Sequence, residues 1–399
     1  MKDAFTVANH SHPDQPKAWP TTSLEHLAKD LHVTYGISDR GLPDHQGVVR
    51  AGDIRDGRIG TDQPGCEGGV VLPETRATLK RDDLAVVLVR RVGEAALVTR
   101  EHEGWMATRG VGIVRSENAP HMARWLRIWL RTPRARVWIQ QHVSAHVEPT
   151  LSIDALRKMP VAVPPREQIE KLHELVTLIE DKTRLNLSIA ADAVALADAH
   201  FAILNRHRGS WPTCGLARVT RASSGRAAPS TPPEDGVDTG WAAPSDILNA
   251  RLPYLGSPGR RHLAAPSDVC EAGTILIATR PEGASAVVAT RPVAAGRSVL
   301  AVRTGDDPAN RWWLLHEFRL RGRELSAVAQ GRQAREITKR AFSRLEAAWP
   351  EGAVRQEFYR VAQPLHQVAQ QRVEESATLN EALMALLSAL PSGADRPLR

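Results

Sequence analysis

The sequence contains few cysteines and no spacing that binds zinc or forms a redox pair. Its 399 residues include three cysteines, Cys66, Cys214 and Cys270, which lie far apart and form no Cys-x-x-Cys motif. Unpaired cysteines suit a reducing compartment, so we expect a cytoplasmic protein. No apolar run approaches about 18 residues and the polar N-terminus has no signal pattern, so we expect neither a membrane span nor secretion.

The motifs of the common catalytic sites are also missing. The dipeptide Gly-Lys never occurs, which excludes a phosphate-binding P-loop, and there is no His-Glu-x-x-His motif. There is also no Asn/Asp-Pro-Pro-aromatic stretch of the kind that amino-methyltransferases use to hold a target base. We interpret Glu180-Asp181-Lys182, which resembles a nuclease cluster, as the solvated face of a helix. The sequence therefore predicts a chain that binds rather than catalyses, with no metal site and no cofactor of its own.

The charge that is present is positive and is carried mainly by arginine. The net charge is +7 and the sequence pI is about 9.6. Arginine binds phosphate and guanine in a bidentate manner better than lysine does, so this balance favours a nucleic-acid partner. A genome whose base composition favours arginine codons would produce the same excess, and the sequence alone leaves both explanations open.

One stretch, from Pro164 to Arg206, reads as a single helix of about 40 residues. Two prolines suit its start, and Glu167 and Glu170 lie in its first turns, where the helix dipole favours negative charge. Its length would be roughly 60 Å at about 1.5 Å per residue. A second helical pattern runs from Gln356 to Leu390, and we expect it to start or bend at Pro364.

Both patterns carry apolar rows at helical spacing, which we expect to pack against each other or to bind a partner. In the first helix, a second row consists of Leu185, Ile189, Leu196 and Ile203. The candidate partner-binding residues are Ile169, Leu172, Val176, Ile179, Val361, Leu365, Val368 and Leu379.

The segments around these helices have a mixed α+β texture. Val-rich runs broken by glycine predict short strands, including a hairpin around Gly93. Amphipathic stretches predict helices at 122–130 and 312–318, whose paired tryptophans we interpret as core residues rather than as platforms for stacked bases. A short helix is expected over 24–31, and 222–236 is expected to be a mobile loop.

The two α+β segments resemble each other. Trp19-Pro20-Thr21 recurs as Trp211-Pro212-Thr213, and Asp53-Ile54 recurs as Asp246-Ile247. The pairs Arg90/Arg280, Gly93/Gly283, Arg124-Trp125/Arg311-Trp312 and Pro164/Pro350 follow in the same order. Such an ordered set of matches indicates an internal repeat.

The expected fold class is α+β, with two repeated domains alternating with two long helices that pack as an antiparallel coiled coil. The expected segments are a flexible tail at 1–18, a domain at 19–158, a long helix at 159–208, a domain at 209–349, a long helix at 350–391 and a tail at 392–399.

This pattern resembles the specificity (S) subunit of type I restriction-modification systems. The most specific stretch is Leu151 to Val176, LSIDALRKMPVAVPPREQIEKLHELV, which is similar to the family's junction between a target recognition domain and a long helix. The segment Arg50 to Ile59 is similar to the family's Gly-Asp-Ile segment. The chain departs from the family at its second junction, where Trp349-Pro350-Glu351-Gly352 lacks Pro-Pro and Glu-Gln.

The resemblance implies a function without catalysis in this chain. Each α+β domain would be a target recognition domain that reads half of a split, asymmetric sequence in double-stranded DNA. The helices would bind DNA adenine methyltransferase subunits, which carry S-adenosylmethionine, and a restriction subunit could join them. The candidate DNA-binding residues are Arg50, Arg58, Arg90, Arg109, Arg251, Arg260, Arg261, Arg280 and Arg297.

Two other functions stay open on the sequence alone. The chain could be an assembly protein whose helical hairpin holds a defence complex together without reading DNA. It could also be an enzyme whose site matches no known motif. Salt-dependent binding to DNA would support the specificity subunit over the assembly protein. An intrinsic activity that is lost on a single substitution would support the enzyme.

Overall fold

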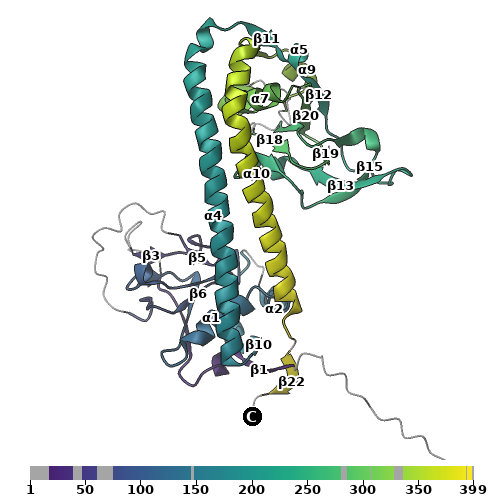
Figure 1. Cartoon of the computed structure of the whole chain (residues 1–399). Helices are drawn as coiled ribbons and strands as arrows, with labels where there is room; N and C mark the ends of the chain where they lie inside the picture. The colour runs from purple at the N-terminus through teal and green to yellow at the C-terminus, as the bar shows by residue number, and fades with distance from the viewer. Residues whose placement is uncertain are drawn as a thin grey trace, which may run out of the picture. The chain divides into compact units, whose positions relative to one another are not determined.

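The computed structural model describes residues 18–38, 47–60, 75–144, 148–279, 285–305, 307–327, 336–391 and 393–397. The chain divides into two compact units (Figure 1). The first unit contains Met1–Asp181 and Leu379–Arg399, and the second contains Lys182–Thr378. Each unit is α+β, and two long helices, α4 (Arg166–Leu204) and α10 (Gly352–Ala389), contribute one segment to each. The expected α+β class with two long helices is therefore confirmed.

The first unit is built on an antiparallel sheet with the strand order β2-β9-β6-β7. Gly93, with φ of 85°, turns the chain between β6 and β7, which confirms the predicted hairpin. The strands are β1 (Trp19–Ser23), β2 (His32–Tyr35), β3 (Val48–Val49), β4 (Ile54–Arg55), β5 (Arg58–Ile59), β6 (Leu84–Val87), β7 (Ala95–Leu97), β8 (Met106–Ala107), β9 (Val111–Arg115), β10 (Pro160–Ala162) and β22 (Gly393–Pro397). The shorter helices are η1 (Leu24–His26), η2 (Arg100–His102), α1 (Pro120–Trp129), α2 (Pro133–His142) and α3 (Ile153–Lys158).

The tryptophans of α1 lie in the core of the first unit, as predicted. Trp125 is fully buried, and its indole N–H donates to the carbonyl of Ala162 at 2.8 Å. The ring of Trp19 meets Trp125 edge to face, with ring centroids 5.5 Å apart. Trp125 therefore packs its apolar ring in the core while its polar N–H forms a hydrogen bond, which is usual for a buried tryptophan.

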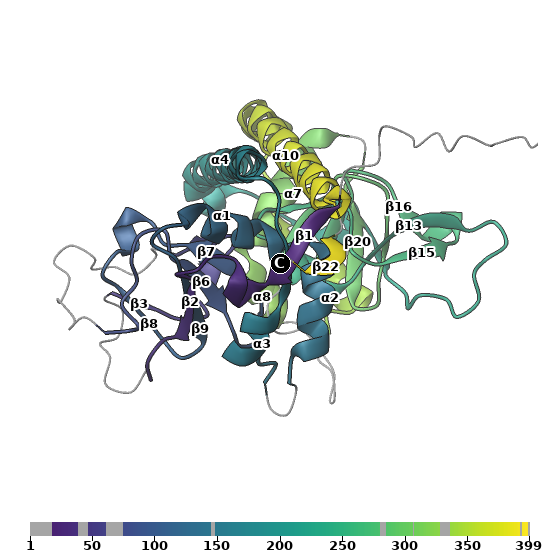
Figure 2. The same cartoon turned by 90° about the horizontal axis from the view of Figure 1, so that it is seen from below.

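The chain ends of the first unit form a small sheet of their own. β10 pairs antiparallel with β1, and β22 pairs parallel with the other edge of β1 (Figure 2). Residues 393–397, which the sequence predicts to be a tail, are therefore a strand. A five-residue strand beside β1 covers backbone groups of β1 that would otherwise be an open sheet edge.

The second unit contains an antiparallel sheet core, β12-β20-β17-β18, extended by β14, and a second sheet with the order β15-β13-β19-β16. β12 begins at Arg221, so residues 222–224 are a strand rather than part of a loop. The strands are β11 (Thr213–Gly215), β12 (Arg221–Ser224), β13 (Val237–Ala242), β14 (Tyr254–Leu255), β15 (Arg261–Ala264), β16 (Val269–Cys270), β17 (Ile275–Ala278), β18 (Ala286–Ala289), β19 (Val293–Ala295), β20 (Val299–Arg303) and β21 (Glu346–Ala348). The shorter helices are η3 (Asn205–Ser210), α5 (Leu216–Val219), α6 (Pro244–Leu248), η4 (Pro266–Asp268), α7 (Pro308–Leu320), α8 (Gly322–Ala327) and α9 (Lys339–Ser343).

The segments of α4 and α10 in the second unit run antiparallel. Lys182, early in this segment of α4, pairs with Glu375 of α10 at 3.2 Å. Near the other end, the ring of Phe201 meets Phe358 edge to face. The buried positions of α4 in this unit are mostly small, and they are Ala190, Ala193, Val194, Ala197 and Phe201.

Helix boundaries differ from the predictions in three places. The helix expected at 24–31 is the single turn η1, and the first long helix begins at Arg166, after the strand β10. α10 begins at Gly352 and continues through Pro364 instead of starting there. Pro364 is exposed, so the carbonyl that loses its N–H partner lies on the solvent side, where water can replace the bond.

The acidic stretch in the middle of α4 is not a solvated face, which corrects the sequence interpretation. Glu180 is only 12% exposed and pairs with two arginines of the region around α1: Arg127 at 2.7 Å, and Arg131. Asp181 pairs with Arg58 of β5. Within the first unit these contacts attach α1 and β5 to α4.

Because Arg127 is 6% exposed, removing its carboxylate leaves a buried charge without a partner. We expect Glu180→Ala to destabilise the chain by about 3 kcal/mol. Thermal unfolding of the full-length chain measures this. The matched control is Glu174→Ala on the exposed side of the same helix, for which we expect a change within about 0.5 kcal/mol. Equal effects of the two substitutions would contradict this role of Glu180.

The second unit contains a buried chain of hydrogen bonds that joins β14, α10, α7 and α4. Tyr254 Oη lies 2.6 Å from His366 Nδ1, and His366 Nε2 lies 2.9 Å from His316 Nε2. His316 Nδ1 lies 2.6 Å from Asp198 Oδ1, and Arg319 donates to the other oxygen of Asp198. The indole of Trp312 stacks on His366 with ring centroids 3.8 Å apart.

One proton arrangement satisfies every member of this chain. Tyr254 donates to His366, His366 donates to His316, and His316 donates to Asp198, so both imidazoles are neutral. Burial lowers the pKa of His366 to about 2 and also lowers the pKa of His316. Burial raises the pKa of Asp198, but hydrogen bonds from His316 and Arg319 outweigh this and lower it to about 2.

These pKa shifts predict an acid-sensitive second unit. In the unfolded chain the two histidines take up protons below about pH 6.5, whereas the folded chain resists protonation, so stability is present above that pH and is lost as pH falls. Each histidine contributes a loss of up to about 1.4 kcal/mol per pH unit. Thermal unfolding at a series of pH values between neutral and mildly acidic measures it. The His366→Gln variant should show a shallower pH dependence, and an unchanged slope would contradict the assignment.

Candidate nucleic-acid interface

The predicted DNA-binding arginines of the first unit do not form one surface of free cations. Arg58 pairs with Asp181, and Arg90 pairs with Glu148 at 2.5 Å. Arg50 is half-buried, and its backbone N–H donates to Asp53 at 2.8 Å. Arg109 is exposed, and its backbone N–H donates a hydrogen bond to the carbonyl of Ile37. Among the four, Arg58 and Arg90 therefore already have carboxylate partners inside the unit.

The predicted arginines of the second unit lie mostly on exposed turns. Arg260 and Arg261 lie at the start of β15, where Arg261 pairs with Asp238 of β13 at 2.9 Å. Arg251 and Arg297 are exposed, and Arg297 precedes Ser298, whose φ of 65° marks a tight turn. Arg280 lies outside the described residues. Arg260 and Arg261 are thus neighbours at one exposed site, at the start of β15, whereas Arg251 and Arg297 lie on other exposed turns.

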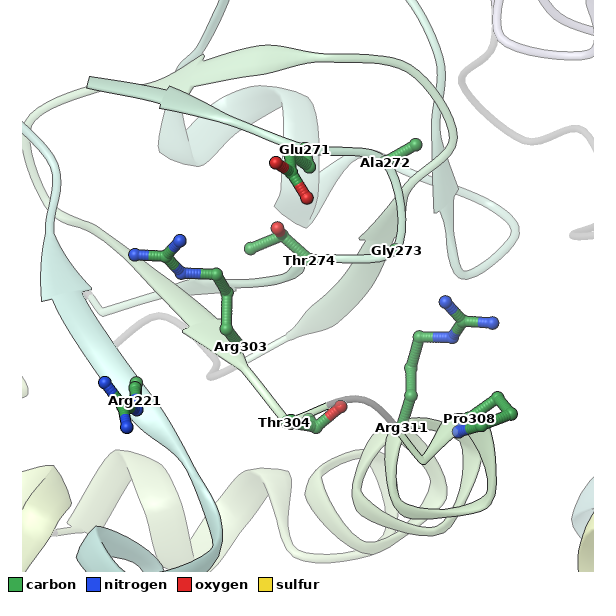
Figure 3. A pocket seen from close by; sticks show the side chains of 10 residues that line it. Arg221, Glu271, Ala272, Gly273, Thr274, Arg303, Thr304, Pro308 and Arg311 are labelled. Atoms are coloured by element: carbon green, nitrogen blue, oxygen red, sulfur yellow. The ribbon is translucent and has the colours of Figure 1, made fainter. Parts of the chain in front are cut away.

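Three arginines that the sequence analysis did not predict to bind DNA line one hollow in the second unit. Arg303 ends β20, Arg221 begins β12, and Arg311 lies on the first turn of α7 (Figure 3). The hollow has a volume of about 450 Å³, and we call it the arginine hollow. Its other lining residues are Glu271, Ala272, Gly273, Thr274, Thr304, Gly305 and Pro308.

None of the three arginines forms an ion pair within the described part of the chain. Arg311 lies over the ring of Trp312, and its Nε is buried without a hydrogen-bond partner among the described residues. Burial lowers the pKa of Arg311, because the charged form loses contact with water. Three arginines and one carboxylate, that of Glu271, thus line the hollow. Arg221 and Arg303 are brought together by the pairing of β12 with β20, which the sequence did not indicate.

The predicted partner-binding residues are divided between the core and the surface. Ile169 and Val176 are fully buried in the first unit, with Leu172 and Ile179 packed against the same core. In the second unit Leu365 packs against the core, whereas Val368 is 40% exposed. Val361 and Leu379 are half-buried. The two fully buried residues, Ile169 and Val176, cannot reach a partner in this fold.

The other apolar row of α4 is largely exposed, whereas its member Ile189 is half-buried. In the second unit Leu185, Leu196 and Ile203 are 52%, 58% and 52% exposed. In the first unit Leu178 is 61% exposed. The spacings of seven, eleven and seven residues place these side chains on one face of a helix. This face therefore carries leucine and isoleucine side chains on the solvent side.

By length and composition alone, α4 together with η3 is apolar enough to cross a membrane. Its most apolar stretch of 18 residues has a mean hydropathy of 1.6, and 28% of that stretch is buried in the structure. An amphipathic helix of a soluble protein satisfies the same test, and α4 buries one side in each unit.

The described residues contain no cluster of three or more His, Cys, Asp or Glu side chains able to hold a metal ion. Cys66 lies outside the described residues. Cys214 and Cys270 are half-buried free thiols.

Several solved structures are similar to this chain, among them the following three, whereas no family model and no curated protein sequence matches it. The S subunit of a type I restriction-modification system from M. genitalium aligns over 98% of both chains, with 12% identity and a TM-score of 0.58. The HsdS subunit from Thermoanaerobacter tengcongensis aligns over 93% of this chain and 96% of its own, with 18% identity and a TM-score of 0.33. A chain from a type I restriction-modification system, solved to explain complex assembly and conformational transition, aligns over 94% and 97%, with 19% identity and a TM-score of 0.41.

Of these three, the M. genitalium subunit is similar enough in backbone geometry to assign a fold. The alignment runs through both α+β units and both long helices, since it covers nearly all of each chain. This chain therefore has the fold of a type I restriction-modification S subunit.

Proposed function

We propose that this chain is the specificity subunit of a type I restriction-modification system. It reads a bipartite, asymmetric sequence in double-stranded DNA and recruits an adenine methyltransferase, while a restriction subunit joins the same assembly. The observation that carries the proposal is the S-subunit fold over the whole chain. The junction from Leu151 to Val176, which resembles that of the family, supports it independently.

The two α+β units would be the two target recognition domains, related as an internal repeat. The registers of their central strands support this. Leu84 of β6 pairs with Val114 of β9, and Ile275 of β17 pairs with Val302 of β20. Asp82 and Gly273, which lie two positions before the first residues of β6 and β17, both have left-handed backbones, with φ of 66° and 91°.

Side-chain contacts support the same alignment. The indole of Trp125 donates to the last residue of β10, and the indole of Trp313 donates to the last residue of β21. Under the proposed repeat Trp125 would correspond to Trp313, one position from the match with Trp312 that the sequence analysis made. In the second unit Asp246 accepts from the N–H three residues before it, as Asp53 does in the first.

The exposed row of α4 would be where a methyltransferase subunit binds. Leu185, Leu196 and Ile203 face solvent on the second unit, whereas the alanines beside them are buried against α10. The methyltransferase would supply S-adenosylmethionine and the chemistry of methyl transfer. This chain would supply only recognition and attachment.

The test of the function is a genome-wide map of adenine methylation in the host with and without this gene. We expect a single split, asymmetric motif to lose its methylation when the gene is absent, because the subunit chooses the target. A catalytic subunit should still be expressed in the deletion strain, as the control. If every motif remains methylated, the chain does not choose a methylation target, and the assembly-protein function is favoured.

The test of the docking surface is a double variant, Leu185→Ser with Leu196→Ser. We expect a loss of affinity for the methyltransferase subunit of roughly 100-fold or more, since each of the two leucines contributes about 1.5 kcal/mol or more when it is buried. Thermal stability should change by less than about 0.5 kcal/mol, because both side chains are exposed. Copurification and calorimetry of the purified subunits measure the two quantities.

The matched control is Leu187→Ser, which makes the same change on the opposite side of α4 and should leave binding intact. An equal loss in both variants would show that the row is not the docking surface. Binding of the chain to lipid vesicles, abolished by the same double variant, would assign this row to a membrane instead.

A further inference from the structure

Each unit has an arginine at the end of a corresponding strand, but only the arginine of the first unit pairs with a carboxylate among the described residues. β9 of the first unit ends in Arg115, and β20 of the second ends in Arg303. Each follows the last valine of a strand that pairs in the same register with its neighbour. The two arginines therefore correspond under the proposed repeat.

In the first unit the arginine has an internal partner. Arg115 donates from Nε and from a terminal nitrogen to the two oxygens of Asp83, at 2.7 and 2.5 Å. Asp83 is 1% exposed, and the preceding residue, Asp82, lies 3.8 Å from Arg124. This bidentate pair is the strongest geometry available to a guanidinium group inside a protein. It leaves no free fork for an external anion.

In the second unit both carboxylates are missing. The residue that corresponds to Asp83 is Thr274, and the residue that corresponds to Asp82 is Gly273. Thr274 is buried, but its side chain carries no charge, and Arg303 is exposed without an ion-pair partner among the described residues. The space left by the two carboxylates is part of the arginine hollow.

The hollow has the chemistry of a phosphate site. Arg303 faces the turn that carries Glu271 and Thr274, Arg311 rises from α7 beside Gly273, and Arg221 lies next to Arg303 (Figure 3). A carbon added at Gly273 would lie 2.4 Å from a terminal nitrogen of Arg311, so this guanidinium occupies the room that a side chain would fill. The hydroxyls of Thr274 and Thr304 also line the hollow. Among the described residues that line the hollow, Glu271 is the one opposing charge, which leaves a net excess of two positive charges.

We propose that Arg303, with Arg221 and Arg311, binds a backbone phosphate of double-stranded DNA on the second unit, and that the first unit lacks this contact. The proposal rests on the proposed function, because that function supplies the DNA. A phosphate contact carries no base information, but it fixes the position of a protein on the duplex. A contact present on one unit alone would give the two halves of the target unequal affinities.

The decisive variant is Thr274→Asp, which restores on the second unit the carboxylate that pairs with the arginine of the first. We expect folding to be intact, because the same pair already fits the same backbone register around Asp83. We expect the slope of log affinity against log salt concentration to become shallower by about one, because one phosphate contact is lost. Arg303→Gln should give the same change without adding a negative charge.

The measurement is fluorescence anisotropy of a labelled duplex of arbitrary sequence with the full-length chain over a series of salt concentrations. The control is Arg206→Gln, which removes one charge from an exposed position on η3 and should leave the slope unchanged. A wild-type slope in both Thr274→Asp and Arg303→Gln, with wild-type DNA binding, would overturn the hollow as a DNA contact while leaving the proposed function in place.

Two further outcomes separate the alternatives. Inorganic phosphate that stabilises the wild-type chain but not Arg303→Gln, with no change of slope on DNA, would assign the hollow to a free anion and overturn the DNA contact. A wild-type chain that shows no salt-dependent binding to duplex DNA would overturn the proposed function and the phosphate contact together.

Discussion

Each unit depends on the burial of one side of α4 and α10 within its own core. In the second unit Phe201 of α4 and Phe358 of α10 pack against Trp313 of α7. In the first unit Ile169 and Val176 of α4 share a core with the tryptophans of α1 and with Leu383 and Leu387 of α10. The helices α1 and α7 each have one side on a sheet, and their other side needs an apolar cover. Segments of the long helices supply that cover, so α4 and α10 are structural parts of both units rather than linkers.

The choice of small residues on the buried side of α4 has a functional consequence. Alanine at three of the buried positions lets the two helices approach closely, and the larger leucines and isoleucines remain outside. Leucines exposed at regular spacing lower the solubility of a protein, so a helix surface that stays in contact with water is expected to carry polar side chains instead. The proposed methyltransferase subunit would cover this surface.

The two units differ in which of their arginines are paired with carboxylates, and this difference fits the proposal that each unit reads a different half of the DNA target. The first unit uses its carboxylates internally, since Asp83 holds Arg115, and Glu180 holds Arg127 and Arg131. The second unit replaces Asp83 with Thr274 and leaves Arg303 facing solvent. Under the proposed repeat, the two units thus present different electrostatic surfaces. Divergence of this kind is what recognition of an asymmetric DNA target requires.

The sequence alone was sufficient for the α+β class, the two long helices, the hairpin at Gly93, the buried tryptophans and the resemblance to S subunits. These features depend on local periodicity and on motifs, both of which can be read within a short stretch of chain. The partners of Glu180, the buried chain from Tyr254 to Asp198 and the strand at 393–397 could not be predicted in this way. Each of them joins residues far apart in the sequence, and charge or helical periodicity does not say what a side chain will meet.

The row of α4 illustrates the limit best. Periodicity showed that Leu185, Leu196 and Ile203 share a face, and it suggested that this face would be buried. Only the tertiary structure decided that the alanine face is covered and the leucine face is exposed, because close helix packing favours small side chains over large ones. Likewise the sequence shows an excess of arginine, but only the fold separates arginines that already hold a carboxylate from those left to bind something else.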